Sequence, residues 1–173
     1  MSYSFPQRLS WAIEYSKDPI WEKIYRSYFP TVLTITNHYL HSGPHQQQGI
    51  DRALELSNGS RITIEEKIRK SGPERADFLI EFENIGKNGN KTPGWVEKPL
   101  TCDYLMFHYK DSQESYLFPW PLMQQAWWQN KAAWLKKYEV LSIRREHNTL
   151  AIPREAFYQA IVAETYRNFS LST

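Results

Sequence analysis

Residues 49–69 read GIDRALELSNGSRITIEEKIR, and they contain the clearest pattern for both the fold and the candidate site. Apolar and polar side chains alternate over residues 50–56, and the same alternation returns over residues 61–69. Alternation with a period of two is typical of β-strands that bury one face. The Ser-Asn-Gly-Ser sequence that separates the two runs is typical of a turn. The stretch therefore predicts a β-hairpin.

The register of this hairpin depends on which apolar side chains meet. A two-residue turn at Asn58-Gly59 would place Leu54 opposite Thr63, an apolar side chain against a polar one. One extra turn residue, or a bulge, would instead place Leu54 opposite Ile64 and unite the two apolar faces. Burial of one large aliphatic side chain is worth about 1.5–3 kcal/mol, so we expect the second register.

Three charged side chains fall on the polar face of the hairpin in this register. Glu65 and Lys67 are two residues apart and share a strand face. Asp51 would lie opposite Lys67 and diagonal to Glu65. Two carboxylates offer hard oxygen ligands to Mg²⁺ or Mn²⁺, and a neighbouring ammonium can orient water or stabilise a transition state, so the group suits phosphodiester cleavage. The alternative is a solvated face whose ion pairs contribute about 0.2–1 kcal/mol each.

The remaining chain adds helices and further strands. The predicted elements are a helix between Asp18-Pro19 and Pro30, strands at residues 77–83, 103–109 and 115–118, a helix from Pro121 to Tyr138, a short hairpin around His147-Asn148, and a helix from Pro153. In the last helix, the residues expected to face inward are Phe157, Ala160, Ile161 and Tyr166. This order predicts the α/β or α+β class, with one mixed β-sheet flanked by helices in a single domain of residues 1–173.

Composition limits the classes of protein that this chain can belong to. Of its 173 residues, 41% are apolar and 15% aromatic, enough for a core, and Lys and Arg exceed Asp and Glu by 21 to 19. This balance is too even to predict a nucleic-acid partner from charge alone. Cys102 is the single cysteine, which excludes an intrachain disulfide framework and is consistent with a reducing compartment. No membrane span or secretory signal is visible, so we expect a cytoplasmic protein.

The hairpin motif resembles that of the PD-(D/E)xK nuclease superfamily. Gly49-Ile50-Asp51 is followed, on the next predicted strand, by Glu65-Glu66-Lys67, an acid-x-lysine motif. The element order over residues 21–118 is also similar, although an isoleucine precedes Asp51 where the family name has proline. The stretches GIDR, ITIEEKIR, DFLIEFE and CDYL are similar to small phage and prophage proteins assigned to that superfamily.

This resemblance implies a restriction-endonuclease-like fold and a metal-dependent nuclease that acts on DNA, with RNA not excluded. It implies that Asp51 and Glu65 are catalytic metal ligands, that the Glu66 main-chain carbonyl is a further ligand, and that Lys67 is the catalytic lysine. The implied cofactor is Mg²⁺, for which Mn²⁺ could substitute.

The resemblance also suggests residues around this centre. Glu22, on the first helix, is the candidate for an additional acid, although it lies on the polar side of that helix. Gln48 and Arg69 could contact phosphates of the nucleic acid. The rival hypothesis is a non-catalytic nucleic-acid-binding or protein-interaction module with the same fold. A homodimer is one of the oligomeric states left open.

Two other groups of residues have simpler interpretations. His38, His41 and His45 cluster, but the loop lacks a fourth partner, which disfavours a zinc site. Tryptophans at helical spacing predict core packing rather than base stacking, with Trp128 the expected exposed exception.

Overall fold

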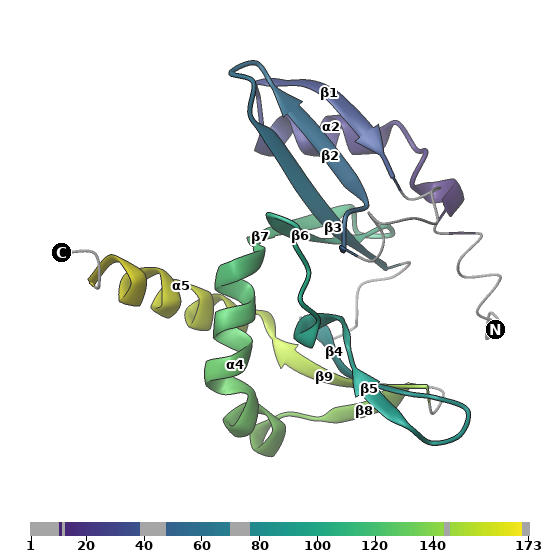
Figure 1. The fold of residues 1–173 in the computed structure, drawn as a ribbon, viewed down its shortest axis with the longest axis vertical. Coiled ribbons are helices and arrows are strands. Elements are labelled where there is room, and N and C mark those ends of the chain that lie inside the picture. The colour runs from purple at the N-terminus through teal and green to yellow at the C-terminus, as the bar shows by residue number, and fades with distance from the viewer. Residues whose placement is uncertain (1–10, 12, 39–47, 70–76, 144–145, 171–173) are drawn as a thin grey trace. The chain divides into compact units, whose positions relative to one another are not determined.

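The computed structural model describes residues 11, 13–38, 48–69, 77–143 and 146–170. Two compact units divide the chain, one of Met1–Ser71 with Leu100–Phe118, the other of Gly72–Pro99 with Pro119–Thr173. Each unit contains its own β-sheet (Figure 1). The mixed α+β class is confirmed, but the expectation that all strands form one sheet is wrong. Both units are made of two separated chain segments, and the single domain of residues 1–173 stays a prediction.

The first unit contains a mixed five-stranded sheet. Its strands are β1 (Val32–Asn37), β2 (Arg52–Leu56), β3 (Arg61–Arg69), β6 (Tyr104–Tyr109) and β7 (Glu114–Pro119). They follow the order β1-β2-β3-β6-β7. The strand β2 runs antiparallel to both β1 and β3, whereas β3 and β6 are parallel. The predicted hairpin therefore lies inside the sheet, with neighbours on both sides.

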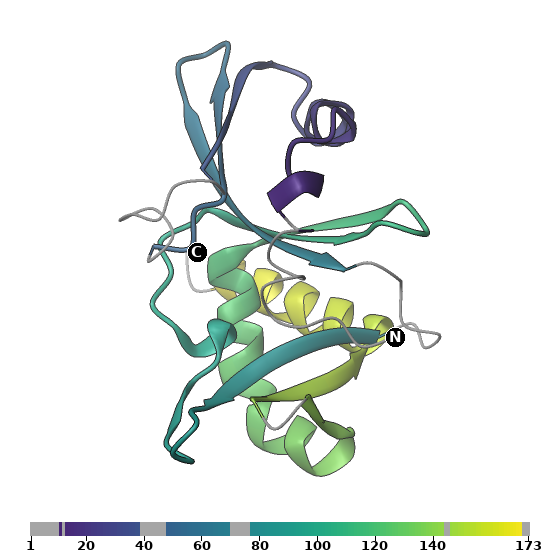
Figure 2. The same cartoon turned by 90° about the vertical axis from the view of Figure 1, so that its right-hand side faces the viewer.

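Helix α2 (Ile20–Tyr28) covers one face of this sheet; Figure 2 shows it end-on beside the strands. Asp18 precedes the helix, and its Oδ1 accepts a hydrogen bond from the Ile20 N–H at 2.9 Å. This bond satisfies one of the N–H groups that a helix start leaves without a partner. Trp21 and Tyr25, one turn apart, form the buried side. The helix predicted between the two prolines is confirmed.

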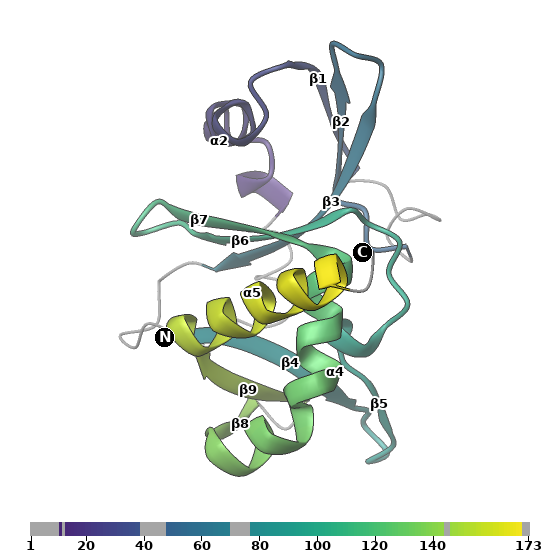
Figure 3. The same cartoon turned by 90° about the vertical axis from the view of Figure 1, so that its left-hand side faces the viewer.

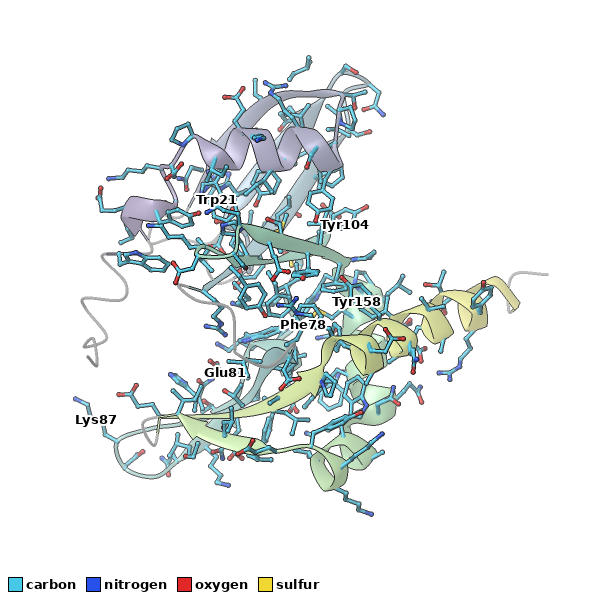
Figure 4. All side chains as sticks on the ribbon, turned by 180° about the vertical axis from the view of Figure 1, so that it is seen from behind. Trp21, Phe78, Glu81, Lys87, Tyr104 and Tyr158 are labelled. Carbon is cyan, nitrogen blue, oxygen red and sulfur yellow. The ribbon has the colours of Figure 1, made fainter. Side chains whose placement is uncertain are left out.

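The core of the first unit lies between α2 and the sheet. Trp21 packs in one cluster with Leu54, Ile64 and Met106, which come from three adjacent strands and are fully buried. Figure 4 shows the Trp21 side chain on the side of α2 that faces the strands. Its indole N–H donates a hydrogen bond to the Tyr15 carbonyl at 2.9 Å, so its polar atom is satisfied as well.

The β2–β3 hairpin unites its apolar faces as predicted, but its register is shifted by two residues from the expected one. Leu54 pairs with Ile62 and not with Ile64. Leu56 donates its N–H to the Ser60 carbonyl at 2.9 Å, which leaves three residues in the loop, the last of which is Gly59. Gly59 has a φ of 82°, as this type of loop requires at its third position. The expected register would have required Ser60 to adopt that conformation, which disfavours it.

The second unit contains an antiparallel four-stranded sheet of order β5-β4-β9-β8. Its elements are β4 (Asp77–Ile85), β5 (Lys91–Pro93), the short 3₁₀ helix η1 (Trp95–Glu97), helix α4 (Trp120–Lys137), β8 (Val140–Ile143), β9 (His147–Pro153) and helix α5 (Arg154–Ser170). Figure 3 shows α5 running beside β4 and β9 and crossing α4. Across the described residues, no helix has both the length and the apolar character needed to cross a membrane.

Aromatic side chains form much of the core of this second unit. The ring centroids of Phe78 and Phe157 are 5.3 Å apart, and those of Trp134 and Phe157 are 6.0 Å apart. Trp128, by contrast, is 50% exposed, so the expected exception is confirmed. The inward orientation expected for Tyr166 is wrong, since this side chain is 71% exposed. Tyr166 follows the buried Ile161 by five residues, which places it about 140° further around the helix.

Candidate active site

The polar face of β3 carries the two predicted residues of the acid-x-lysine motif. Glu65 and Lys67 lie on the face opposite Ile64, and the Lys67 Nζ forms an ion pair with the Glu65 Oε1. The two side chains are 13% and 17% exposed, so this pair is largely removed from water. Burial of this kind strengthens the electrostatic interaction between them.

Asp51 precedes β2 and joins these two residues. Its N–H donates to the Ile64 carbonyl at 2.9 Å, and its Oδ2 accepts a hydrogen bond from the Glu66 main-chain N–H at 2.8 Å. The Asp51 side chain is buried. Burial and the negative charges of Glu65 and Glu66 hold the pKa of Asp51 well above its usual value, and Lys67 opposes this effect. The structure therefore brings Asp51, Glu65 and Lys67 together.

The pairing partner expected for Asp51 is wrong. Arg52 pairs with Ile64, so Asp51, one residue earlier, lies beside Glu65 and diagonal to Lys67. This correction follows from the position of the three-residue loop, which spans residues 57–59 with Gly59 at its third position, one residue earlier than the expected register requires. It places the two carboxylates next to each other, so that the charge of Glu65 adds to burial, the larger effect, in raising the pKa of Asp51.

Lys67 carries a positive charge in this setting. Burial disfavours the ammonium, but the carboxylates of Glu65 and Asp51 outweigh burial and raise the pKa of Lys67. At neutral pH the side chain is therefore a hydrogen-bond donor and a cation, and it is unsuited to accept a proton.

The turn before Asp51 is set by close packing. Gly49 has a φ of 71°, and a Cβ at this position would lie 2.9 Å from the Leu100 side chain. The Gln48 carbonyl accepts a hydrogen bond from the Thr101 N–H at 2.9 Å. The Gln48 side chain is exposed, three residues before Asp51. It remains available as a contact for a ligand that approaches the site.

The other two predicted residues differ in their relation to this site. Arg69 is half-buried on the same face of β3, close enough that its charge partly opposes the rise in the pKa of Lys67. Glu22 is 63% exposed and pairs with Arg26 at 3.0 Å on α2, the helix that covers the opposite face of the sheet. The structure therefore places Arg69 beside the candidate site but does not bring Glu22 to it.

A buried ionic group that the sequence analysis missed lies behind the site. The Glu66 side chain points to the apolar face, where its Oε1 accepts hydrogen bonds from the Arg52 Nε at 2.7 Å and the Tyr25 hydroxyl at 2.5 Å. Burial raises the pKa of Glu66, and Arg52 and Tyr25 oppose that effect. The sequence does indicate this buried group, because Arg52 alternates in phase with Leu54 and its side chain is therefore expected on the apolar face of β2.

Cys102 and His38 also lie close to the candidate site. Cys102 is buried near Glu65, and burial together with that negative charge raises the pKa of its thiol to about 12. The thiol is therefore protonated and unreactive. Of the histidine cluster, His38 donates its main-chain N–H to the Asp51 carbonyl at 2.8 Å, while His41 and His45 lie outside the described residues.

The chemistry of the donor set fits a hard divalent cation. Oδ2 of Asp51 and Oε1 of Glu65 are engaged by the protein, and each carboxylate has a second oxygen that could coordinate an ion. In the parts of the chain that the structure describes, no group of three or more His, Cys, Asp or Glu side chains could hold a metal. Mg²⁺ commonly uses one or two carboxylates with water and substrate phosphates, so two acids suffice for it.

No protein-family model, curated protein or solved structure matches this chain. Membership of the PD-(D/E)xK nuclease superfamily therefore stays a prediction that depends on the hairpin motif.

Proposed function

We propose that this protein is a metal-dependent nuclease that hydrolyses phosphodiester bonds of DNA. The observation that supports this most is the convergence of Asp51, which directly precedes β2, with Glu65 and Lys67 on the polar face of β3. The ionised form of the buried Asp51 is costly to maintain, because burial and the neighbouring charges of Glu65 and Glu66 disfavour it. A divalent cation would relieve that cost.

In this proposal each residue has a separate task. Asp51 and Glu65 hold Mg²⁺ or Mn²⁺, together with the Glu66 carbonyl. When bound, the ion supplies charge neutralisation at the phosphate and a more acidic water molecule. Lys67, as an ammonium, donates a hydrogen bond to a phosphate oxygen and stabilises the negative charge that grows there as water attacks phosphorus and the P–O bond breaks.

The proposed substrate contacts extend from the same face. Arg69 is the next residue on this face after Lys67, and Gln48 is exposed in the turn before Asp51. A guanidinium and an amide suit phosphate oxygens, and such contacts position a nucleic acid without reading its sequence. The proposal therefore expects affinity that falls with salt and depends weakly on base sequence.

A cleavage assay tests the proposal. The purified chain is incubated with single-stranded, duplex and branched DNA and with RNA, in Mg²⁺, Mn²⁺ or EDTA. We expect divalent-dependent cleavage of DNA that Lys67→Ala lowers by orders of magnitude, with little change in DNA affinity. The matched control is Lys91→Ala, which removes a lysine that also pairs with a carboxylate, Glu83, at 3.0 Å.

The same assay separates the rival function. Tight binding without cleavage of any substrate, together with affinity that is independent of divalent ions, would support the non-catalytic module instead. Cleavage of RNA alone would keep the nuclease and change its substrate. Equal cleavage by wild type and Lys67→Ala would contradict the role given to Lys67.

A further inference from the structure

Residues Asp51 and Arg52 hold residue 66 from opposite faces of the sheet. On the polar face, the Asp51 Oδ2 accepts the Glu66 main-chain N–H at 2.8 Å. On the apolar face, the Arg52 Nε donates to the Glu66 Oε1 at 2.7 Å, and the Tyr25 hydroxyl donates to the same oxygen at 2.5 Å. The Asp51 carboxylate is thus oriented by the Glu66 main-chain N–H, and residue 66 is itself held in place by the contacts of its side chain with Arg52 and Tyr25 on the other face of the sheet.

The Arg52 side chain is anchored at a second point. Its Nη2 donates to the Ser16 carbonyl at 2.5 Å, and its guanidinium lies 5.1 Å from the centre of the Trp21 ring. The side chains of Arg52 and Glu66 are 5% and 0% exposed. A lysine could supply the charge but not two directed bonds in one plane, so the geometry requires arginine.

Stability alone does not explain this ion pair. Apolar side chains of similar volume often stabilise a protein as well as a buried ion pair does, or better, because burying two charges is costly. The surrounding face is apolar, with Leu54 and Ile64 in the same core cluster. Two charged residues here therefore call for a role that apolar residues could not fill.

We propose that Arg52, Glu66 and Tyr25 form a positioning group that fixes the Glu66 N–H and, through it, the Asp51 carboxylate. The inference rests on the proposed function for its consequence, since a correctly oriented carboxylate is what metal binding needs. Outer residues that orient metal ligands commonly change metal affinity by about 10–100-fold when they are replaced.

Metal binding gives the first test, with Mn²⁺ itself as the probe in isothermal titration. Glu66→Leu and Arg52→Met should weaken Mn²⁺ binding by about tenfold or more. Glu66→Gln keeps an oxygen acceptor for Arg52 and Tyr25, so it should recover most of the affinity that Glu66→Leu loses. Leu54→Ala is the control, because it destabilises the same core without removing a hydrogen bond of the positioning group. An equal loss of Mn²⁺ affinity in Leu54→Ala would overturn the inference, because it would mean that Arg52, Glu66 and Tyr25 affect metal binding only through the stability of the core.

A second measurement needs no metal. In the amide NMR spectrum of the metal-free protein, the Glu66 N–H should exchange slowly and resonate downfield because a carboxylate accepts its hydrogen bond. Arg52→Met, which leaves residue 66 itself unchanged, should shift this resonance and speed its exchange, as Asp51→Ala should, whereas Leu54→Ala should not shift it. An unchanged resonance and exchange rate in Arg52→Met would overturn the inference even if the wild type binds no Mn²⁺. A failure of Mn²⁺ binding in the wild type would overturn only the proposed function.

Discussion

The Lys67 ammonium forms an ion pair with the Glu65 carboxylate, two residues away on the same face of β3. This pair neutralises one of the two acids that the proposed metal site needs. A metal cation that enters the site must therefore compete with the Lys67 ammonium for the Glu65 carboxylate. The two positive charges also repel each other. In the proposed mechanism, the lysine therefore stabilises the transition state but opposes metal binding in the ground state.

Removal of Lys67 should separate these two effects. We expect Lys67→Met to bind Mn²⁺ several-fold more tightly than wild type, because a competing cation has gone, while DNA cleavage is lost. Titration calorimetry measures the first effect. Lys110→Met is the control, since the Lys110 Nζ lies 4.6 Å from the centre of the Tyr15 ring, on an aromatic partner and not beside the two acids. Weaker Mn²⁺ binding in Lys67→Met would contradict the competition.

The raised pKa of Asp51 predicts a pH-dependent stability effect. The pKa of Asp51 in the folded state exceeds the unfolded value of about 3.9, so ionisation of this carboxylate lowers the free energy of unfolding. This loss of stability develops as the pH rises from the unfolded pKa to the folded pKa. Asp51→Asn should therefore raise the thermal midpoint of the metal-free protein at neutral pH by a few degrees, on the order of 1 kcal/mol. The gain should shrink as pH falls toward about 4.

Thermal unfolding at several pH values checks this prediction. The control is Glu14→Gln, which removes a 70% exposed acid paired with Lys17, a contact expected to be worth less than about 1 kcal/mol. Addition of Mn²⁺ should stabilise the wild type but not Asp51→Asn. A lower midpoint for Asp51→Asn at neutral pH would mean that the charge of Asp51 is favourable in the folded state.

Burial patterns in the sequence predicted the elements better than their partners. Alternation identified the strands at β3 and β4, and both are present. Alternation reports which side of a strand is buried but not which strand lies beside it, so it could not show that β4 belongs to a second sheet. The parallel pairing of β3 with β6 joins segments about 40 residues apart, and no local pattern specifies it.

The candidate site shows the same division. The phase of Glu65 and Lys67 along β3 was enough to place them on one face. The register, which sets whether Asp51 lies beside Glu65 or Lys67, depended on which loop residue adopts a positive φ. A loop position with positive φ favours glycine, so the sequence already pointed to Gly59 at that position. Burial of the apolar side chains alone, however, is compatible with either of the two registers. Glu66 also alternates in phase with Ile64 and Ile68, and a charged residue on that apolar face indicates a buried partner of opposite charge.

The core of the first unit predicts a contrast between two leucines. Leu54 is fully buried in the cluster beneath α2, whereas Leu33 on β1 is 62% exposed. Leu54→Ala should cost about 2–5 kcal/mol because it removes buried methyl groups and leaves a cavity. Leu33→Ala should change stability by less than about 0.5 kcal/mol. Urea unfolding followed by tryptophan fluorescence measures both. Similar losses for the two variants would contradict the register and packing described for β1 and β2.

The salt dependence of DNA binding tests the placement of substrate along β3. Arg69 lies on the face of Lys67, and its charge acts on that residue, while Arg61 lies at the other end of the strand and faces Glu55 at 3.6 Å. If the backbone of DNA crosses the site, Arg69→Ala should weaken binding and reduce the slope of log affinity against log salt by about 0.9, the loss expected for one phosphate contact. Arg61→Ala should leave the slope unchanged.

Binding titrations at several salt concentrations, in Ca²⁺ to suppress cleavage, give both slopes. Equal changes in the two variants would mean that DNA is held by charge spread over the surface, and an unchanged slope in Arg69→Ala would move the DNA path away from this end of β3.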